Sequence, residues 1–205
     1  MKKKNDNKVT RHIPAELLDD LSSRFVERRL EALKQLQRRT GSQYLEPVFS
    51  GLLKDKNELV RIEAASALGN VSSKSALRSL WVATKDKVAL VRGYAFEAIG
   101  KLGNDQDALM IMKSLSRERS AFVLLNQYEA LFVLGKKQFF GDLLAYLASP
   151  NYRIRCACAN TIAQIKMNKT EARTAKQMLR RRLKSEASRA ARSSMRTALR
   201  ELNPS

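Results

Sequence analysis

Apolar residues occur along this chain at helical spacing, and the same pattern of spacing is found in several successive copies. Val60 is followed by apolar residues four and eight positions later, and Arg61 stands directly after it. Val91 and Arg92 begin the same pattern 31 residues further on. Positions separated by four and eight residues fall on one face of a helix. Each copy therefore predicts an amphipathic helix.

Further copies extend the pattern in both directions. Ile154 and Arg155 begin a good copy, Arg29 and Arg192 mark weaker ones, and a degenerate copy aligns Gln127 with the arginine. Another apolar-periodic stretch precedes each of these helices, at 43–54, 73–85, 106–116, 137–148 and 170–184, with a pair near 14–39 before them all. A period near 30 residues is typical of a solenoid. The pattern predicts an all-α, right-handed α-α superhelical solenoid of about six helix pairs, none of which buries its apolar face alone.

A turn residue and an arginine recur together in these copies. The segment from Asp55 through Arg61 to Gly69 resembles the HEAT repeat, especially the short bacterial form called PBS-lyase HEAT-like, and Asp86 through Arg92 is similar. The resemblance implies that the turn acid and the arginine six residues later form a ladder between neighbouring repeats. The expected ladder residues are Asp55, Arg61, Asp86, Arg92 and Arg155. In the copy around 121–135 both members are expected to be missing.

Composition agrees with a helical chain. The 205 residues include 8 Gly and 4 Pro, and 44% are apolar. Few breakers favour long helices. We expect a disordered basic tail at 1–12 and a single HEAT-like α-solenoid domain at 13–203, with a basic C-terminal capping pair at 166–203. Because no apolar run has the length of a membrane span and no secretory signal is visible, a cytoplasmic protein without membrane contact is expected.

The exposed face of the second helices carries glutamates and aromatic residues. The helical register predicts that this row points away from the core, and the resemblance to HEAT-like stacks implies that it lines the concave surface. The residues predicted to bind a protein or peptide there are Tyr94, Glu97, Tyr128, Glu129 and Phe132. Exposed aromatic residues ringed by polar groups are typical of protein-binding hot spots. The alternative, that these rings fold into the core between repeats, is open at this stage.

Positive charge is concentrated at the C-terminus. The formal net charge is +19, and residues 166–205 hold 12 Lys or Arg against 3 acids. The residues predicted to bind an anion or nucleic acid are Arg173, Lys176, Arg180, Arg181, Lys184, Arg189, Arg196 and Arg200. A terminal repeat also needs a polar outer face, which explains polarity but not one sign of charge. Anion binding and solubility are both open.

The sequence contains no recognisable set of catalytic residues. Some HEAT-like proteins are iron-dependent hydroxylases with paired His-Glu motifs, but His12 is the single histidine. Cys156 and Cys158 stand two apart, on different faces of a helix, so neither a disulfide nor a metal site is expected. No cofactor is expected. The predicted function is a non-catalytic scaffold or adaptor for a protein or peptide, and the alternative is a nucleic-acid binder, distantly similar to HEAT-fold DNA glycosylases.

Overall fold

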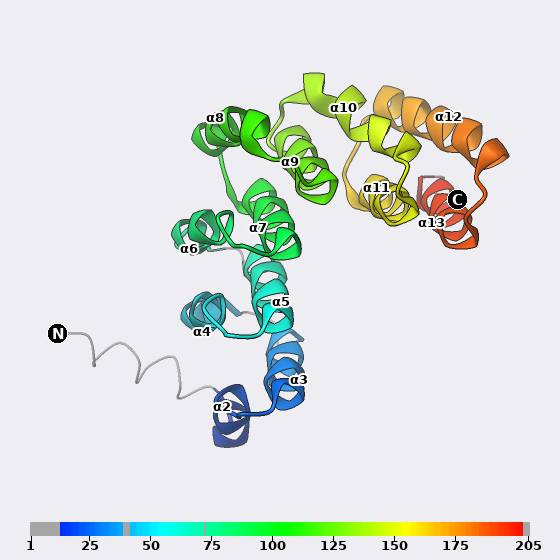
Figure 1. The fold of residues 1–205 in the computed structure, drawn as a ribbon. Coiled ribbons are helices and arrows are strands. Elements are labelled where there is room, and N and C mark those ends of the chain that lie inside the picture. Colours follow the sequence, from blue (N-terminus) through cyan, green and yellow to red (C-terminus); the bar gives the residue numbers. More distant parts are fainter. Residues whose placement is uncertain (1–12, 39–41, 72, 203–205) are drawn as a thin grey trace. The chain divides into compact units, whose positions relative to one another are not determined.

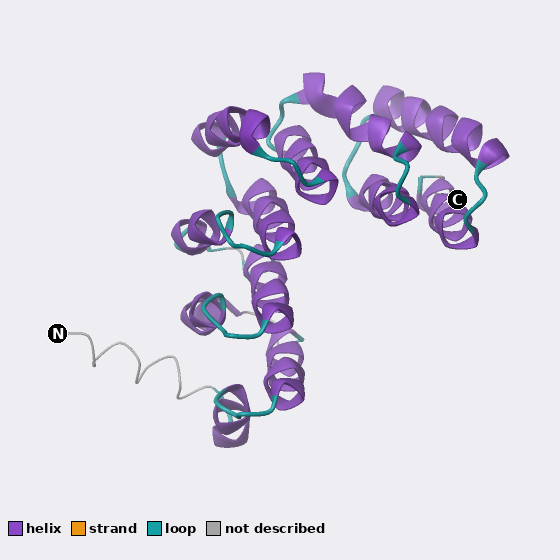
Figure 2. Cartoon of the chain, viewed as in Figure 1, coloured by secondary structure: helices purple, strands orange, loops and turns teal. Residues whose placement is uncertain are grey.

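Helices joined by short loops make up the protein. The structure is a computed structural model that describes residues 13–38, 42–71 and 73–202. No strand occurs among these residues (Figure 2), and the predicted all-α class is confirmed. The predicted basic tail at 1–12 lies outside the described residues.

Within the described residues, six consecutive helix pairs follow one another along the chain (Figure 1). The pairs are α2 (Ala15–Leu21) with α3 (Val26–Gln37), α4 (Glu46–Leu52) with α5 (Glu58–Gly69), α6 (Ala76–Ala83) with α7 (Ala89–Leu102), α8 (Asp105–Ser114) with α9 (Ala121–Val133), α10 (Phe140–Ala145) with α11 (Tyr152–Gln164), and α12 (Lys169–Ser185) with α13 (Arg189–Glu201). Short 3-10 helices extend some of them: η1 (Ser42–Leu45), η2 (Leu115–Arg117), η3 (Lys137–Phe139) and η4 (Tyr146–Ala148). The predicted number of pairs is confirmed, and the hand of a superhelix stays a prediction.

The pairs divide into two compact units. The first unit ends at Asn104 and contains α2 to α7, and the second begins at Asp105 and contains α8 to α13. Each unit is described by itself below. The expectation of one domain over 13–203 stays a prediction.

Polar residues fix where several helices begin. The Asn57 side chain accepts the N–H of Leu59 at 2.9 Å, and Asn151 does the same for Arg153 at 3.0 Å. Asn168 and Glu171 form a reciprocal capping box at the start of α12. Such caps satisfy N–H groups that have no partner within the helix. The caps also set the register of each helix relative to its turn.

The second helices of the pairs pack against one another, and residues of the first helices complete both cores. In the first unit α5 packs against α3 and α7, and Leu33, Leu68 and Ile99 are fully buried. Trp81 is half-buried and meets Phe96 edge to face at 6.1 Å. In the second unit α11 packs against α13, around a cluster that includes Leu143, Cys158, Leu179 and Met195.

The repeated arginines lie between pairs and bind the next turn. Arg29 donates through Nε and Nη2 to the Asp55 carboxylate at 2.8 and 2.9 Å. Arg61 makes the same two-pronged contact with Asp86 at 2.8 and 3.1 Å, and Arg155 with Glu186 at 2.6 Å for both bonds. Planar guanidinium matches a carboxylate in this way, which fixes orientation as well as distance.

The same arginines also hold their own turns. The Nη1 groups of Arg61 and Arg92 donate to the carbonyl oxygens of Asp55 and Asp86, both at 2.9 Å. Arg155 Nη1 donates to the Ser149 carbonyl oxygen at 2.7 Å. Each arginine therefore fixes the turn before its own helix, and in the three two-pronged pairs it also binds the turn of the following pair.

The fourth pair departs from the register that the sequence predicted. The arginine stands four residues after the N-cap, as with Asn57 and Arg61, and the N-cap of α9 is Ser120. Leu124 therefore occupies the arginine position, and Glu118 is the turn acid, whose carboxylate accepts the Ser120 N–H at 2.8 Å. The alignment on Gln127 and the expectation that the acid is missing were wrong.

The wrong alignment of Gln127 with the ladder arginine came from a glycine. Gly135 lies beyond the end of α9 with φ of 86°, a left-handed conformation that favours glycine. Gly69 and Gly100 instead lie within α5 and α7. Treating Gly135 as their equivalent moved the predicted register by three residues.

Candidate functional site

One candidate surface lies on the second helices of the first unit. Leu59 of α5 and Leu90 of α7 stand at the same position, two residues after the N-caps, and are 51% and 44% exposed. Glu63, Tyr94 and Glu97 continue the same helix faces and are half-buried. We call these five residues the α5–α7 patch. Since α5 packs against α7, the two leucines belong to one surface.

Acidic side chains surround the tyrosine of this patch. Burial raises the pKa of Tyr94, and the charges of Glu97 and Glu63 raise it further. Lys101 Nζ lies 2.7 Å from Glu97 Oε1, and Gln37 Nε2 donates to Glu63 Oε1 at 3.0 Å. The Tyr94 phenol therefore stays protonated at neutral pH. The carboxylates of Glu97 and Glu63 are held by Lys101 and Gln37.

The structure does not bring the five predicted protein-binding residues together as one exposed patch. Tyr94 and Glu97 lie on α7 in the first unit, and Tyr128, Glu129 and Phe132 lie on α9 in the second. Of these three, Phe132 is fully buried, Glu129 is 7% exposed and Tyr128 is half-buried.

The expected exposure of Phe132 was wrong. Its ring stacks on Phe140 at 4.8 Å, and Lys137 Nζ lies 3.5 Å from its centroid. The corrected register explains this burial, because Phe132 stands twelve residues after Ser120, as Gly69 does after Asn57, on the side that receives the next pair. The Glu129 carboxylate accepts the Thr161 hydroxyl at 3.2 Å.

The sequence analysis missed the two exposed leucines. Their signal was present, because both follow a turn by the same number of residues and fall outside the buried stripe of their helices. Two apolar residues at equal positions in neighbouring repeats indicate a shared surface better than either residue does alone.

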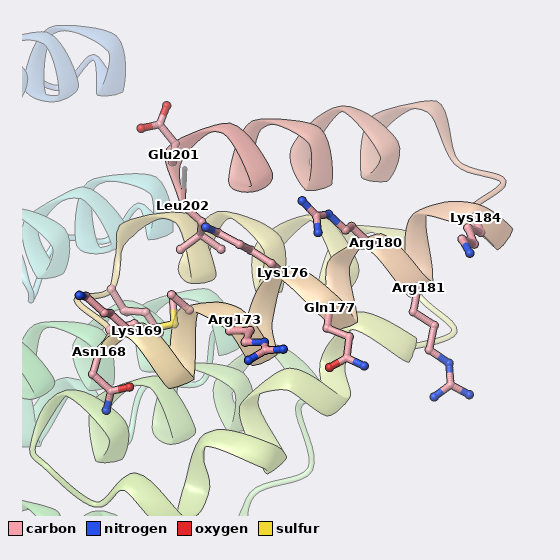
Figure 3. A pocket seen from close by; sticks show the side chains of 13 residues that line it. Asn168, Lys169, Arg173, Lys176, Gln177, Arg180, Arg181, Lys184, Glu201 and Leu202 are labelled. Atoms are coloured by element: carbon pink, nitrogen blue, oxygen red, sulfur yellow. The ribbon is translucent and has the colours of Figure 1, made fainter. Parts of the chain in front are cut away.

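A second candidate surface is a basic groove in the second unit. Its volume is about 1020 Å³, and its cationic lining consists of Lys169, Arg173, Lys176, Arg180, Arg181 and Lys184. Figure 3 shows these side chains spreading from α12, with Leu202 at the end of α13 directed toward α12 and the Glu201 carboxylate directed away from it. Ile165, Met167 and Ala172 add apolar surface. We call this hollow the α12 groove.

The groove contains five of the eight predicted anion-binding residues. Glu201 is the one acid among its lining residues, against six cations. Apart from Lys176, which is half-buried, the cationic side chains are exposed. Like charges along a helix repel each other, which an anionic ligand relieves. The arrangement is suited to a polyanion.

The other three predicted residues lie elsewhere. Arg189, Arg196 and Arg200 line a separate hollow of about 770 Å³ along α13. Arg196 and Arg200 stand where α5 has Ala65 and Gly69, which are buried in the first unit. Long charged side chains at these positions prevent another pair from packing on α13 as α7 packs on α5. This register explains the α13 arginines without a ligand.

The cysteine and acidic side chains of the described residues form no metal centre. Within the described ranges, no three His, Cys, Asp or Glu side chains gather as metal ligands. Both cysteines are free thiols. Burial raises the pKa of the Cys158 thiol, whose Sγ lies 3.3 Å from the Leu143 carbonyl oxygen. Cys158 is therefore a packing residue and not a nucleophile.

Of the helices in the described part of the chain, none has the length and apolar character needed to cross a membrane.

Comparison with known proteins shows which folds this chain resembles. Residues 14–100 match the family model of HEAT repeats, and comparison with curated proteins gives no significant match. Human deoxyhypusine hydroxylase is 15% identical, with a TM-score of 0.57, covering 97% of this chain and 96% of the other. The CpcE–CpcF phycocyanin lyase complex of Nostoc is 15% identical, with a TM-score of 0.46, covering 91% and 93%.

A designed armadillo repeat protein is 18% identical, with a TM-score of 0.41, covering 92% of this chain and 99% of the other. Likeness at these identities concerns the fold, and the hydroxylase has the highest TM-score of the three. Residues 14–100 match the HEAT-repeat model, and the described residues form an all-α fold of consecutive helix pairs that is similar to the fold of the hydroxylase.

Proposed function

We propose that this protein is a non-catalytic adaptor whose α5–α7 patch binds a polypeptide with apolar and basic side chains. One observation carries the proposal: Leu59 and Leu90 are about half exposed at equal positions, on helix faces that also carry Tyr94 and two glutamates. The repeat fold is consistent with a scaffold or peptide-binding role. Deoxyhypusine hydroxylase is an enzyme with the same class of fold, so the absence of catalysis is itself part of the proposal.

The chemistry of the patch defines the partner. Single exposed leucines are ordinary, but neighbouring ones form an apolar surface that a partner can cover. Tyrosine adds a large rigid contact with a polar end. Glu63 and Glu97 favour cations and disfavour anionic partners. A segment that alternates apolar residues with lysine or arginine matches all three features.

Peptide display on the wild-type protein tests this function. We expect selected peptides to combine apolar and basic residues, and the variant L59S/L90S to bind them at least tenfold more weakly. Removing two half-exposed leucine contacts accounts for a loss of about that size. E63Q/E97Q should weaken the same peptides several-fold, because rim charges contribute modestly.

Val82 supplies the matched control, because it is 68% exposed on α6 of the same unit. V82S should leave peptide affinity unchanged. Equal affinity of the selected peptides for wild type and L59S/L90S, with both proteins folded by circular dichroism, would reject the patch as the binding site.

A second candidate function is binding of a nucleic-acid backbone in the α12 groove. The observation that favours it is the single acid among six cations that line one hollow. Lysine and arginine on an exposed helix contact phosphates without reading bases. This function predicts strong salt dependence and little sequence preference.

A further inference from the structure

One junction between helix pairs has lost its arginine and its acid together. Leu124 stands at the arginine position of α9, and Ser149 stands at the acid position of the following turn. The Ser149 hydroxyl accepts the Asn151 N–H at 3.3 Å, as Asp55 does for Asn57 at 2.8 Å. The turn therefore keeps its local shape, although no guanidinium joins it to α9.

A pocket of about 380 Å³ lies at this junction. Ala121 and Tyr128 of α9 contribute to its lining, and so do Ser149 and Pro150 of the following turn. Ala121 and Tyr128 stand one helical turn before and after Leu124, on the same helix face. The pocket therefore lies where an arginine side chain lies at the other junctions, as Arg155 does beside Glu186.

The rest of the lining suits a cation. Tyr146 of η4 lies with its ring centroid 6.1 Å from that of Tyr128, the planes tilted by 42°. Asp142 of α10 also lines the pocket, and its exposed carboxylate forms no hydrogen bond or ion pair with any described residue. Aromatic faces beside a carboxylate attract guanidinium groups.

The tyrosines keep their protons in this setting. Burial raises the pKa of Tyr146 to about 12, with further contributions from Tyr128 and Asp142. Burial also raises the pKa of Tyr128, and Asp142 adds to this. Both phenols are therefore neutral at physiological pH, and both tyrosines line the pocket.

Arginines of the chain close to the pocket in sequence are engaged elsewhere. Arg119 Nη1 donates to the Ser116 carbonyl oxygen at 3.5 Å, and Arg153 Nε donates to the Tyr152 hydroxyl at 3.4 Å. Arg155 is held by Glu186 and by the Ser149 and Pro150 carbonyl oxygens. None of these contacts involves Asp142.

We propose that the pocket between α9 and the turn at Ser149 binds an arginine side chain of a partner polypeptide. The partner's guanidinium would take the place that Arg29, Arg61 and Arg155 take at other junctions. Two tyrosine faces and the Asp142 carboxylate would hold it. This site belongs to the second unit and is separate from the α5–α7 patch and the α12 groove.

Titration of acetyl-Gly-Arg-Gly-amide into the ¹⁵N-labelled full chain, followed by amide chemical shifts, tests the proposal. We expect saturable shifts centred on Tyr128, Asp142 and Ser149, and at least threefold weaker binding of the glycine-only peptide. D142N should weaken binding of the arginine peptide about three- to tenfold, since one partly exposed charge pair and one cation–π contact have that order of effect. Shifts confined to residues around Glu63 and Glu97 would overturn the proposal.

A variant that fills the pocket from within provides the second measurement. L124R/S149D places an arginine and an acid at the spacing of Arg61 and Asp86. We expect it to abolish the shifts around Asp142 without lowering the melting temperature. Undiminished binding by folded L124R/S149D would also contradict the proposal. If that variant fails to fold, D142N still decides the matter, because Asp142 is exposed and outside the core.

Discussion

At the scale of single residues, position decides what an arginine does in this protein. Arg155 and Glu186 are 6% and 3% exposed and share two bonds of 2.6 Å. Removing one member of such a pair leaves a buried charge without compensation, which costs about 3–5 kcal/mol. The joint replacement at Leu124 and Ser149 follows from this, because losing both members leaves no charge behind. Arg180 and Arg181 carry the same charge but lie exposed.

The lowered pKa of Glu186 predicts how the free energy of unfolding depends on pH in acid. The hydrogen bonds from Arg155 lower its pKa from 4.5 to about 2. A lowered folded-state pKa stabilises the protein above the unfolded value, and that stability disappears as the pH falls from 4.5 towards 2. We expect urea unfolding followed by circular dichroism to show a loss of about 3 kcal/mol from this group over that range.

E186Q should be less stable at neutral pH and should lack this part of the decline. E16Q, which changes an exposed acid of α2, serves as the control and should follow the wild-type curve. Parallel curves for wild type and E186Q would show that the Glu186 charge contributes nothing to folding.

At the scale of elements, small residues set the spacing between second helices. A Cβ on Gly69 would lie 3.1 Å from Ala98 Cβ and 3.2 Å from its Cα. The glycine therefore permits close approach of α5 and α7, and a left-handed backbone is not its role.

Gly51 and Gly69, both in helices of the first unit, provide a matched pair of substitutions. G69L should lower the unfolding free energy by about 1–3 kcal/mol, because the added side chain forces α5 and α7 apart. G51L should raise it by about 0.5–1 kcal/mol, since Gly51 in α4 has no atom within 4 Å of an added Cβ and helix propensity improves. Chemical denaturation of both variants measures these changes, and equal effects would refute the close-approach explanation.

At the scale of the whole molecule, the distribution of charge matters more than its total of +19. The first unit presents glutamates beside exposed leucines, whereas the second presents the α12 groove. A uniform coat of positive charge would serve solubility equally well. The groove concentrates charge at one place, which favours a local anionic ligand.

Salt titration of DNA binding tests this charge concentration. R173E/R181E should lower affinity for mixed-sequence duplex DNA at least tenfold at low salt. It should also reduce the slope of log affinity against log salt by about two, as expected for two lost phosphate contacts. Fluorescence anisotropy at several salt concentrations measures both quantities.

K85E/K87E makes the same change of net charge in an exposed turn of the first unit. It should retain most of the affinity. Equal losses in the two variants would show that DNA responds to total charge and that the groove is not a site.

The amino-acid sequence by itself determined the repeat. Apolar spacing predicted the helix pairs, because burial of one helix face is a local requirement that each repeat must meet. The resemblance of the recurring arginines and turn acids to HEAT repeats implied a ladder between neighbouring repeats, and Arg61 forms such a contact with Asp86. The resemblance to HEAT repeats followed from these signals, and the match over residues 14–100 agrees with it.

Only the tertiary structure decided which residues are exposed and which side chains meet. Phe132 is buried because its helix face receives the next pair, and the register of α9 depended on a cap that Gly135 obscured in the sequence. The pocket beside Asp142 and the α12 groove combine residues from different elements. Hydrophobic spacing reports whether a residue faces the core of its own pair, but exposure also depends on the neighbouring pair, which local sequence does not specify.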